Sequence, residues 1–224
     1  MLDRKIVVIK YGESIYNECY IFRGGNPNKM LPISFVIYLI QDGDRNMLVD
    51  VGCNDKAGFD MSIYCEPKEV LKQYGLKPEE ITDIIITHHH HDHIEAAKDY
   101  PNATIHMQKT EYEKAKQYFS DTQTVQLFDE EMTIANDLVL KKVGGHTAGS
   151  SVVICKCNNK HYVFCGDECY VKGCFEKQIP TGVSCNIELS QQFLKDYGNG
   201  AYELLLFHDP DILRGKLGFE LLTF

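Results

Sequence analysis

The distribution of apolar and polar residues along the chain predicts strands mixed with helices. Short apolar stretches separated by turn signals such as Asp42-Gly43-Asp44 are typical of strands. We expect strands at residues 35–40, 46–51, 81–86, 103–107, 132–135, 138–143, 151–157, 161–165 and 203–207. We expect helices at residues 67–74, 94–100, 110–119 and 187–197.

Local signals support two of these helices and a layered architecture. Pro67 opens the first helix and Gly75 follows its last residue, which are the positions that these residues prefer at helix ends. Thr110-Glu111-Tyr112-Glu113 has the pattern of a capping box, so we expect the third helix to begin there. No low-complexity linker divides the chain, and we expect one α/β domain over residues 1–224, with two similar halves and the helices outside.

The pattern His-x-His-x-Asp-His, at residues 88–93, directly follows an apolar stretch. It holds more ligands than one tetrahedral metal needs. Its spacing can direct His88 and His90 to one side while Asp92 and His93 face a second position about 3.5–4 Å away. The four consecutive histidines also resemble a solvated polar run or a purification tag, but this run is internal and carries an aspartate in register. The pattern therefore indicates a site for two metal ions.

Three further residues of metal-ligating type lie in the first turn after an apolar strand. They are His146, Asp167 and His208. Strand ends gather loops into one cleft in layered sheets, so these side chains are expected to join the cluster at residues 88–93. Gly145 and Gly166 precede two of them and allow the tight turns that this requires.

Composition excludes several classes of protein. The net charge of −9 and the absence of a basic block argue against nucleic acid as the main partner. No segment resembles a signal peptide or is long enough to span a bilayer, so we expect a cytoplasmic protein without a membrane partner. The nine cysteines form no Cys-x-x-Cys pair and are interpreted as small buried residues. His106 and His161 fall in or beside predicted strands and are assigned to structure.

Five motifs, in this order, resemble those of the metallo-β-lactamase superfamily. They are Leu48-Val49-Asp50-Val51-Gly52, His88-x-His90-x-Asp92-His93, Gly145-His146-Thr147-x-Gly149-Ser150, Gly166-Asp167 and His208. The resemblance implies an αββα sandwich of two mixed β-sheets flanked by helices. Within the superfamily the chain is most similar to the N-acyl homoserine lactone lactonases, through residues 26–38, Thr110-Glu111-Tyr112-Glu113 and Asp167-x-x-Tyr170-x-Lys172-x-x-Phe175-Glu176-x-x-x-Pro180.

The resemblance also implies a role for each site residue. One metal would be held by His88, His90 and His146, the other by Asp92, His93 and His208, with Asp167 bridging both. Asp50 would orient a ligand without binding the metal. Tyr170 would reach the substrate carbonyl, and His91 and Phe175 would line the substrate pocket. Two departures from the lactonase pattern concern the part of the pocket that would bind the acyl chain of the substrate. His91 occupies a position that is often apolar in lactonases, and residues 53–66 form a shorter stretch than in typical lactonases.

These residues predict a hydrolase with two divalent metal ions. We expect zinc, because imidazoles and carboxylates without a thiolate suit zinc, although they also bind iron, manganese or cobalt. We expect a metal-bridging hydroxide to attack a lactone or related carboxylic ester, with Asp92 or Asp167 moving the proton. The substrate is expected to be a small molecule, and a homodimer is left open. Four alternatives also stay open: a thioester hydrolase, a phosphodiester hydrolase, an iron-dependent redox enzyme and a metal-stabilised sensing module without turnover.

Overall fold

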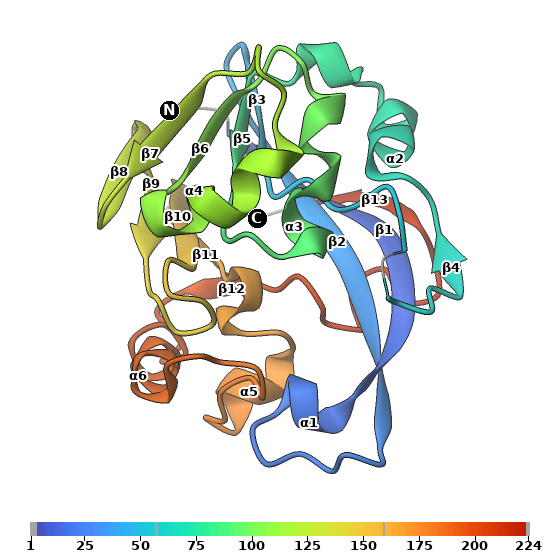
Figure 1. The fold of residues 1–224 in the computed structure, drawn as a ribbon, viewed down its shortest axis with the longest axis vertical. Coiled ribbons are helices and arrows are strands. Elements are labelled where there is room, and N and C mark those ends of the chain that lie inside the picture. The colour runs from blue at the N-terminus through green and yellow to red at the C-terminus, as the bar shows by residue number, and fades with distance from the viewer. Residues whose placement is uncertain (1–3, 57, 159, 223–224) are drawn as a thin grey trace.

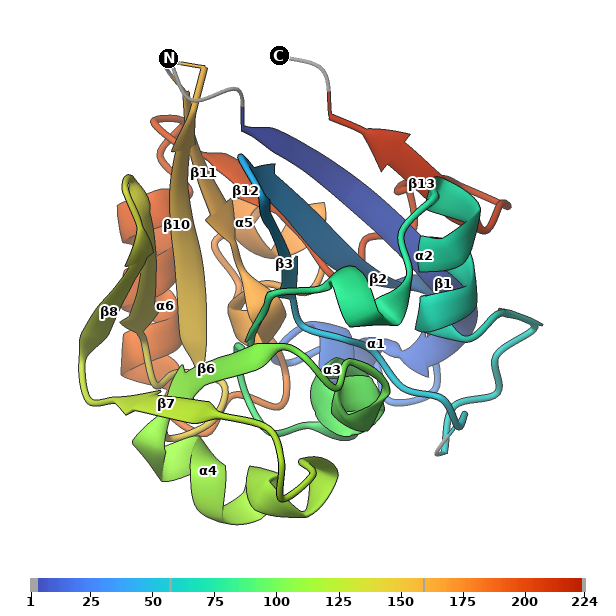
Figure 2. The ribbon, with the colours of Figure 1, turned by 90° about the horizontal axis from the view of Figure 1, so that it is seen from above.

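Two mixed β-sheets pack face to face, and helices lie on their outer sides (Figure 2). The computed structural model describes residues 4–56, 58–158 and 160–222. The first sheet contains, in spatial order, β13 (Gly218–Leu221), β1 (Lys5–Asn17), β2 (Met30–Asp42), β3 (Arg45–Val49), β5 (Asp83–Ile85), β6 (Thr104–Gln108) and β7 (Val125–Phe128), with β4 (Ile63–Tyr64) paired to β1. The second contains β12 (Glu203–Leu205), β11 (Lys160–Phe164), β10 (Ser151–Cys157), β9 (Leu138–Lys142) and β8 (Glu131–Ala135).

Each sheet combines parallel and antiparallel pairs. In the first, β3, β5, β6 and β7 run parallel to one another, whereas β13, β1, β2 and β3 pair antiparallel. In the second, only β11 and β12 are parallel. The strands β1 and β2 are long and extend past the body of the sandwich, where α1 (Glu18–Ile21) connects to them (Figure 1).

Helices occupy the connections between strands. The remaining α-helices are α2 (Pro67–Tyr74), α3 (His91–Ile94), α4 (Lys109–Ala115), α5 (Lys172–Glu176) and α6 (Ile187–Tyr197). Single turns of 3₁₀ helix are η1 (Pro78–Glu80), η2 (Glu95–Asp99), η3 (Lys116–Tyr118) and η4 (Gly166–Glu168). Of the helices described, none has both the length and the apolar character needed to cross a membrane.

Alternation of side chains along the strands produces the sandwich. Along β1, Ile6 and Val8 point toward the second sheet, whereas Val7 and Ile9 belong to the outer core. The buried Val70 and Leu71 of α2 lie in that outer core, because the helix presents its apolar stripe to the sheet. On the other side of the molecule, Phe193 and Leu194 of α6 cover the second sheet in the same way (Figure 2).

The αββα architecture expected from the resemblance is confirmed. Residues 67–74, 151–157 and 187–197 form the predicted helix, strand and helix with the predicted bounds. The prediction that Thr110 caps a helix through a capping box is wrong. The N-cap is Gln108, whose side chain accepts a hydrogen bond from the backbone of Thr110, and Glu111 is buried against a different loop. The sequence analysis did not predict β1, β4, β7, β13, α1 or α5.

Candidate metal centre

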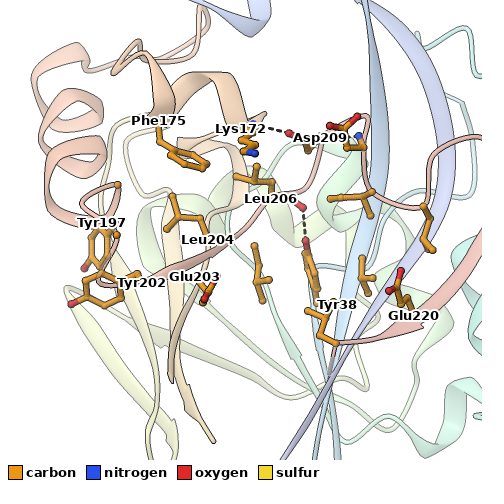
Figure 3. A pocket seen from close by; sticks show the side chains of 18 residues that line it. Tyr38, Lys172, Phe175, Tyr197, Tyr202, Glu203, Leu204, Leu206, Asp209 and Glu220 are labelled. Carbon is orange, nitrogen blue, oxygen red and sulfur yellow. Dashed lines mark hydrogen bonds between the residues drawn. The ribbon is translucent and has the colours of Figure 1, made fainter. Parts of the chain in front are cut away.

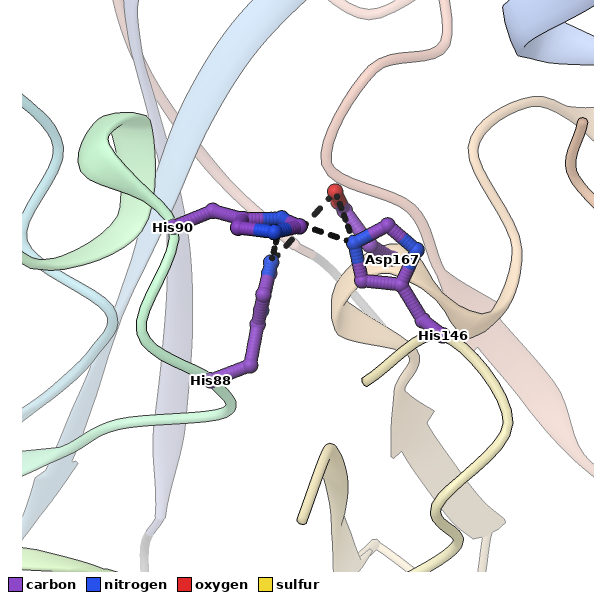
Figure 4. A group of neighbouring side chains, drawn as sticks. All are labelled: His88, His90, His146 and Asp167. Carbon is purple, nitrogen blue, oxygen red and sulfur yellow. Dashed lines mark hydrogen bonds and ion pairs between the residues drawn. The ribbon is translucent and has the colours of Figure 1, made fainter. Parts of the chain in front are cut away.

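The structure brings together all seven side chains predicted to bind metal. They form two groups: His88, His90, His146 and Asp167 (Figure 4), and Asp92, His93 and His208. Within each group the ligating atoms lie within 4.8 Å of one another. The residues follow β5, β9, β11 and β12, so these strand ends do meet in one place.

The carboxylate of Asp167 lies between the two groups. Its Oδ2 is 3.2 Å from Nε2 of His146 and 3.5 Å from Nε2 of His88. Its Oδ1 is 3.0 Å from Nε2 of both His93 and His208. One oxygen therefore faces each group, which is the arrangement of a carboxylate able to bridge two cations.

His90 completes the first group. Its Nδ1 is 3.0 Å from Nε2 of His88 and 2.8 Å from Nε2 of His146. The rings of His90 and His146 meet edge to face, with their centroids 4.7 Å apart. Three imidazole nitrogens thus converge on one point beside a carboxylate oxygen, as the ligands of a tetrahedral metal do.

Asp92 lies at the edge of the second group. Its Oδ2 is 3.6 Å from Nε2 of His208 and 3.8 Å from Nε2 of His93. The backbone carbonyl of Asp92 accepts a hydrogen bond of 2.9 Å from the buried hydroxyl of Tyr11, which fixes the start of α3. Asp92 also lines an adjoining cavity, so it lies between the cluster and this cavity.

Asp50 is connected to two of the histidines by hydrogen bonds, to His93 directly and to His88 through Thr87. It follows β3 with φ of 56°, a strained conformation for a non-glycine residue. Its carboxylate accepts hydrogen bonds of 2.8 Å from both the backbone N–H and the hydroxyl of Thr87, and one of 2.6 Å from Nδ1 of His93. Because the Thr87 hydroxyl donates to Asp50, it accepts from Nδ1 of His88, 3.0 Å away.

These hydrogen bonds decide which ring nitrogens carry lone pairs. Nδ1 of His208 donates to the carbonyl of Ser34 at 3.0 Å. In the neutral rings of His88, His93 and His208 the Nε2 atoms are therefore unprotonated. All three lone pairs face the carboxylate of Asp167, which is repulsive unless a cation lies between them. Nε2 of His93 is buried without a hydrogen-bond partner among the described residues. The imidazole nitrogens and carboxylate oxygens of the cluster therefore fit divalent metal ions.

Electrostatics in the cluster agree with cation binding. Burial lowers the pKa of His88 well below its usual value and that of His146 to about 4, so both are neutral at pH 7, the form that binds metals. Burial also disfavours a charge on His93, but the neighbouring carboxylates, Asp167 foremost, raise its pKa well above the usual value. A positive charge is thus favoured at this point, and either a proton or a metal ion supplies it.

Two buried glutamates, neither assigned a role from the sequence, hold the loop that carries His146. Glu111 accepts hydrogen bonds from the backbone N–H of Gly149 at 2.7 Å and the hydroxyl of Thr147 at 2.9 Å, and it contacts His89. Burial opposes its ionisation, but the hydrogen bond from His89 and its neighbours lower the pKa of Glu111 to about 2. The carboxylate is therefore ionised over the whole physiological range.

Glu168 holds the same loop from the other side. Its Oε1 accepts hydrogen bonds of 3.0 Å from the backbone N–H groups of both Gly145 and His146, and a third from the hydroxyl of Ser150. Burial raises the pKa of Glu168 to about 7. The sequence carries no signal for this role, because two of the three donors to Oε1 are backbone N–H groups of a distant loop.

A cavity of about 320 Å³ opens beside the metal ligands. Its walls are formed by Tyr16, Ile33, Phe59, His90, His91, Asp92, Tyr170, Val183 and His208. The ring of Tyr170 lies 5.0 Å from that of His208 and 5.9 Å from that of His146, measured between centroids. Tyr170 and His91 therefore line the cavity, as expected from the resemblance, and Phe59 comes from the stretch at residues 53–66.

Phe175 was expected in the same pocket, but it does not line this cavity. The short helix α5 directs its ring into a second cavity, of about 510 Å³, whose walls include Tyr38, Tyr197 and Leu206 (Figure 3). His91, which does line the first cavity, is paired with Asp55.

The remaining histidines and the cysteines have structural surroundings. His106 is buried in β6 and its Nε2 is 2.9 Å from Oδ1 of Asp83, whereas His161 is exposed at the start of β11. All nine cysteines are free thiols, and most are buried. The prediction of small buried residues is confirmed for all but Cys19, Cys65 and Cys185.

Comparison with known proteins agrees with this geometry. A family model described as the metallo-β-lactamase superfamily matches residues 36–185. An N-acyl homoserine lactonase of a Bacillus species is 24% identical over 96% of this chain and 97% of its own. A hydroxyacylglutathione hydrolase of Pectobacterium carotovorum is 32% identical over 47% of this chain and 39% of its own.

Solved structures show the same fold. A quorum-quenching N-acyl homoserine lactone lactonase superposes with a TM-score of 0.83 at 22% identity, and the match covers 97% of each chain. AidC, a dizinc quorum-quenching lactonase, superposes with a TM-score of 0.75 at 18% identity over 100% of this chain and 96% of its own. The chain therefore belongs to the metallo-β-lactamase superfamily.

Proposed function

We propose that the chain hydrolyses lactones or related carboxylic esters with two divalent metal ions. His88, His90 and His146 would hold one ion and Asp92, His93 and His208 the other, with Asp167 shared between them. The observation that carries the proposal is the placement of Asp167, whose two carboxylate oxygens face two separate sets of imidazole lone pairs.

When bound, such a pair of cations supplies a water that is acidic enough to act as a nucleophile near neutral pH, and it polarises a carbonyl oxygen. Zinc is the metal that we propose, because the donors are imidazoles and carboxylates and a neighbouring structure is that of a dizinc lactonase.

The chain supplies the groups that bind the substrate and move the proton. Burial and the nearby charge of Asp167 raise the pKa of Tyr170 well above its usual value, so its hydroxyl keeps its proton and can donate to a substrate carbonyl. Asp92 lines the cavity, whereas Asp167 is enclosed by histidines. We therefore assign the transfer of the proton to the leaving oxygen to Asp92.

The cavity supports an acyl lactone as substrate. Tyr16, Ile33, Phe59 and Val183 form an apolar wall next to the ligands, which suits an acyl chain, while the lactone would lie against Tyr170. A relative that matches 96% of this chain is an N-acyl homoserine lactonase, which also favours this class. A thioester hydrolase is the second candidate, because a hydroxyacylglutathione hydrolase matches part of the chain.

A substrate screen of the zinc-loaded protein tests the proposal. Acyl homoserine lactones of several chain lengths, simple esters, thioesters and phosphodiesters would be compared by kcat/KM. We expect lactones to exceed the other classes by at least about tenfold, which corresponds to 1.4 kcal/mol of transition-state binding. A preference for thioesters would favour the second candidate, and turnover of none of them would contradict hydrolysis of this kind.

A further inference from the structure

Glu168 occupies an unusual position between two metal ligands. It follows Asp167 directly in η4, its side chain is fully buried, and all three donors to its Oε1 belong to the loop between β9 and β10. One of these donors is the backbone N–H of His146 itself. A single carboxylate thus links the loop of one proposed ligand to the turn that carries another.

The surroundings of Glu168 are closely packed. A Cβ added to Gly145 would collide with Oε2 of Glu168 and with Oγ of Ser190, so this glycine is needed for the approach of the carboxylate. Ser190, on α6, lies 3.5 Å from Oε2 and supports the side chain from behind. The residue motif Gly145-His146, noted in the sequence for its tight turn, therefore has a definite partner in the structure.

His146 differs from the other buried histidines of the cluster in what holds its ring. Nδ1 of His88 is bound by Thr87, that of His93 by Asp50 and that of His208 by Ser34. Nδ1 of His146 is buried and has no hydrogen-bond partner among the described residues. Its ring is therefore positioned through its own backbone.

We propose that Glu168 is the positioning residue for His146. By fixing the backbone N–H groups of Gly145 and His146, it sets the place of the His146 imidazole relative to Asp167, as Asp50 and Ser34 do for other rings through their Nδ1 atoms. The role needs an oxygen acceptor at this point and does not involve contact with substrate. The inference depends on metal binding as proposed above, but not on the identity of the substrate.

Metal affinity, measured on the metal-free protein by competition with a chromophoric chelator, tests this role. In Glu168→Ala we expect the affinity of one of the two sites for Zn²⁺ to fall about 10- to 100-fold, the usual effect of removing a residue that orients a ligand. Glu168→Gln keeps the acceptor oxygen and should stay within about threefold of the wild type. Glu168→Asp shortens the reach of the carboxylate and should resemble the alanine variant, so it decides the question if Glu168→Ala does not fold.

A matched control separates positioning from general loss of stability. Leu194→Ala shortens a buried side chain of α6 that is not among the proposed ligands, and it should lower the melting temperature without changing the affinity of the folded protein for Zn²⁺. The Co²⁺-substituted protein gives a second readout, since its visible spectrum reports the geometry at each site. We expect the spectrum to change in Glu168→Asp and to stay unchanged in Leu194→Ala.

Each outcome bears on a different claim. Wild-type affinity at both sites in Glu168→Ala or Glu168→Asp would overturn the positioning role, as would an equal loss of affinity in Leu194→Ala. If the wild type binds two ions but hydrolyses no lactone, the proposed substrate is wrong, and the Zn²⁺ affinities of the variants still decide the role of Glu168. If the wild type binds no Zn²⁺, both proposals fail together.

Discussion

At the scale of single residues, the hydrogen-bond partners of the buried histidines determine which ring nitrogen is free to bind a metal ion. Thr87, Asp50 and Ser34 each accept a hydrogen bond from Nδ1 of a histidine, so in the neutral rings the Nε2 lone pairs all face Asp167. The positive φ of Asp50 shows that the backbone accepts strain to place this carboxylate. The clustering of the seven candidate ligands was predictable because the segments that carry them follow apolar strands, whereas the positions of Glu111 and Glu168 were not predictable. Their partners are mainly backbone N–H groups of a distant loop, which leave no mark in the sequence.

Replacing the shared carboxylate tests the centre most simply. Asp167→Ala removes the atoms that face both groups, so we expect loss of both metal ions and a fall in kcat/KM of at least about a thousandfold. Elemental analysis and lactone hydrolysis measure the two effects. Asp129→Ala, which removes an exposed aspartate, is the control and should keep both ions. Full turnover by Asp167→Ala would refute the shared carboxylate.

Tyr170 separates substrate binding from metal binding. In Tyr170→Phe we expect both metal ions to be retained and kcat to fall by about a hundredfold, the lower end of what the loss of one donor to a developing oxyanion costs. Steady-state kinetics at saturating Zn²⁺ measure this change. If the kinetics match those of the wild type, Tyr170 contributes packing alone.

At the scale of elements, the predictions succeeded where local signals and tertiary contacts agree. The helix α2 has Pro67 at its start and Gly75 in a left-handed conformation at its end, and it was predicted with the right bounds. The strand β1 was missed because its apolar run at residues 6–9 is short, and without a neighbouring turn signal such a run cannot be told from a buried helix segment. The capping box failed because the helix begins earlier: Gln108 is the N-cap and accepts from the N–H of Thr110, while Glu113, the acid of the predicted box, pairs with Lys116.

Asp83 connects three neighbouring strands of the first sheet. Its carboxylate, in β5, bonds to Arg45 of β3 at 2.6 Å and 3.0 Å and to His106 of β6 at 2.9 Å. Burial opposes its ionisation, but the hydrogen bonds from His106 and Arg45 hold the pKa of Asp83 well below its usual value. We expect Asp83→Asn to lower the free energy of unfolding by about 2 kcal/mol at pH 7.

The pH dependence of this effect has a definite sign. Because the folded pKa is lowered, the unfolded carboxyl takes up a proton first, so the stabilisation is present above about pH 4 and is lost as the pH falls further. Urea unfolding of both proteins from pH 7 to pH 3 should show the difference shrinking below about pH 4. A difference that grows on acidification would contradict this assignment.

At the scale of the whole molecule, the centre joins the two halves of the chain. Asp50, His88 and Asp92 come from the first sheet and its connections, whereas His146, Asp167 and His208 follow strands of the second. Bound cations would therefore hold the two sheets together at this end of the sandwich. A net charge of −9 adds a general attraction for cations.

Removal of the metal should therefore destabilise the whole fold. Metal ions present at 100 times their dissociation constant stabilise the folded state by about 2.7 kcal/mol per site. A chelator that removes both ions should then lower the melting temperature by roughly 10–20 °C, and Zn²⁺ should restore it. Asp167→Ala should not respond to the chelator. Identical melting curves with and without chelator would show that the cluster holds no metal in solution.

The central claim is that seven side chains, from His88 to His208, hold a pair of metal ions around one shared carboxylate. The number of Zn²⁺ ions bound per chain tests it most directly, measured by elemental analysis after gel filtration in a zinc-buffered solution. The account predicts two ions per chain at saturation. One ion per chain, or none, would contradict it.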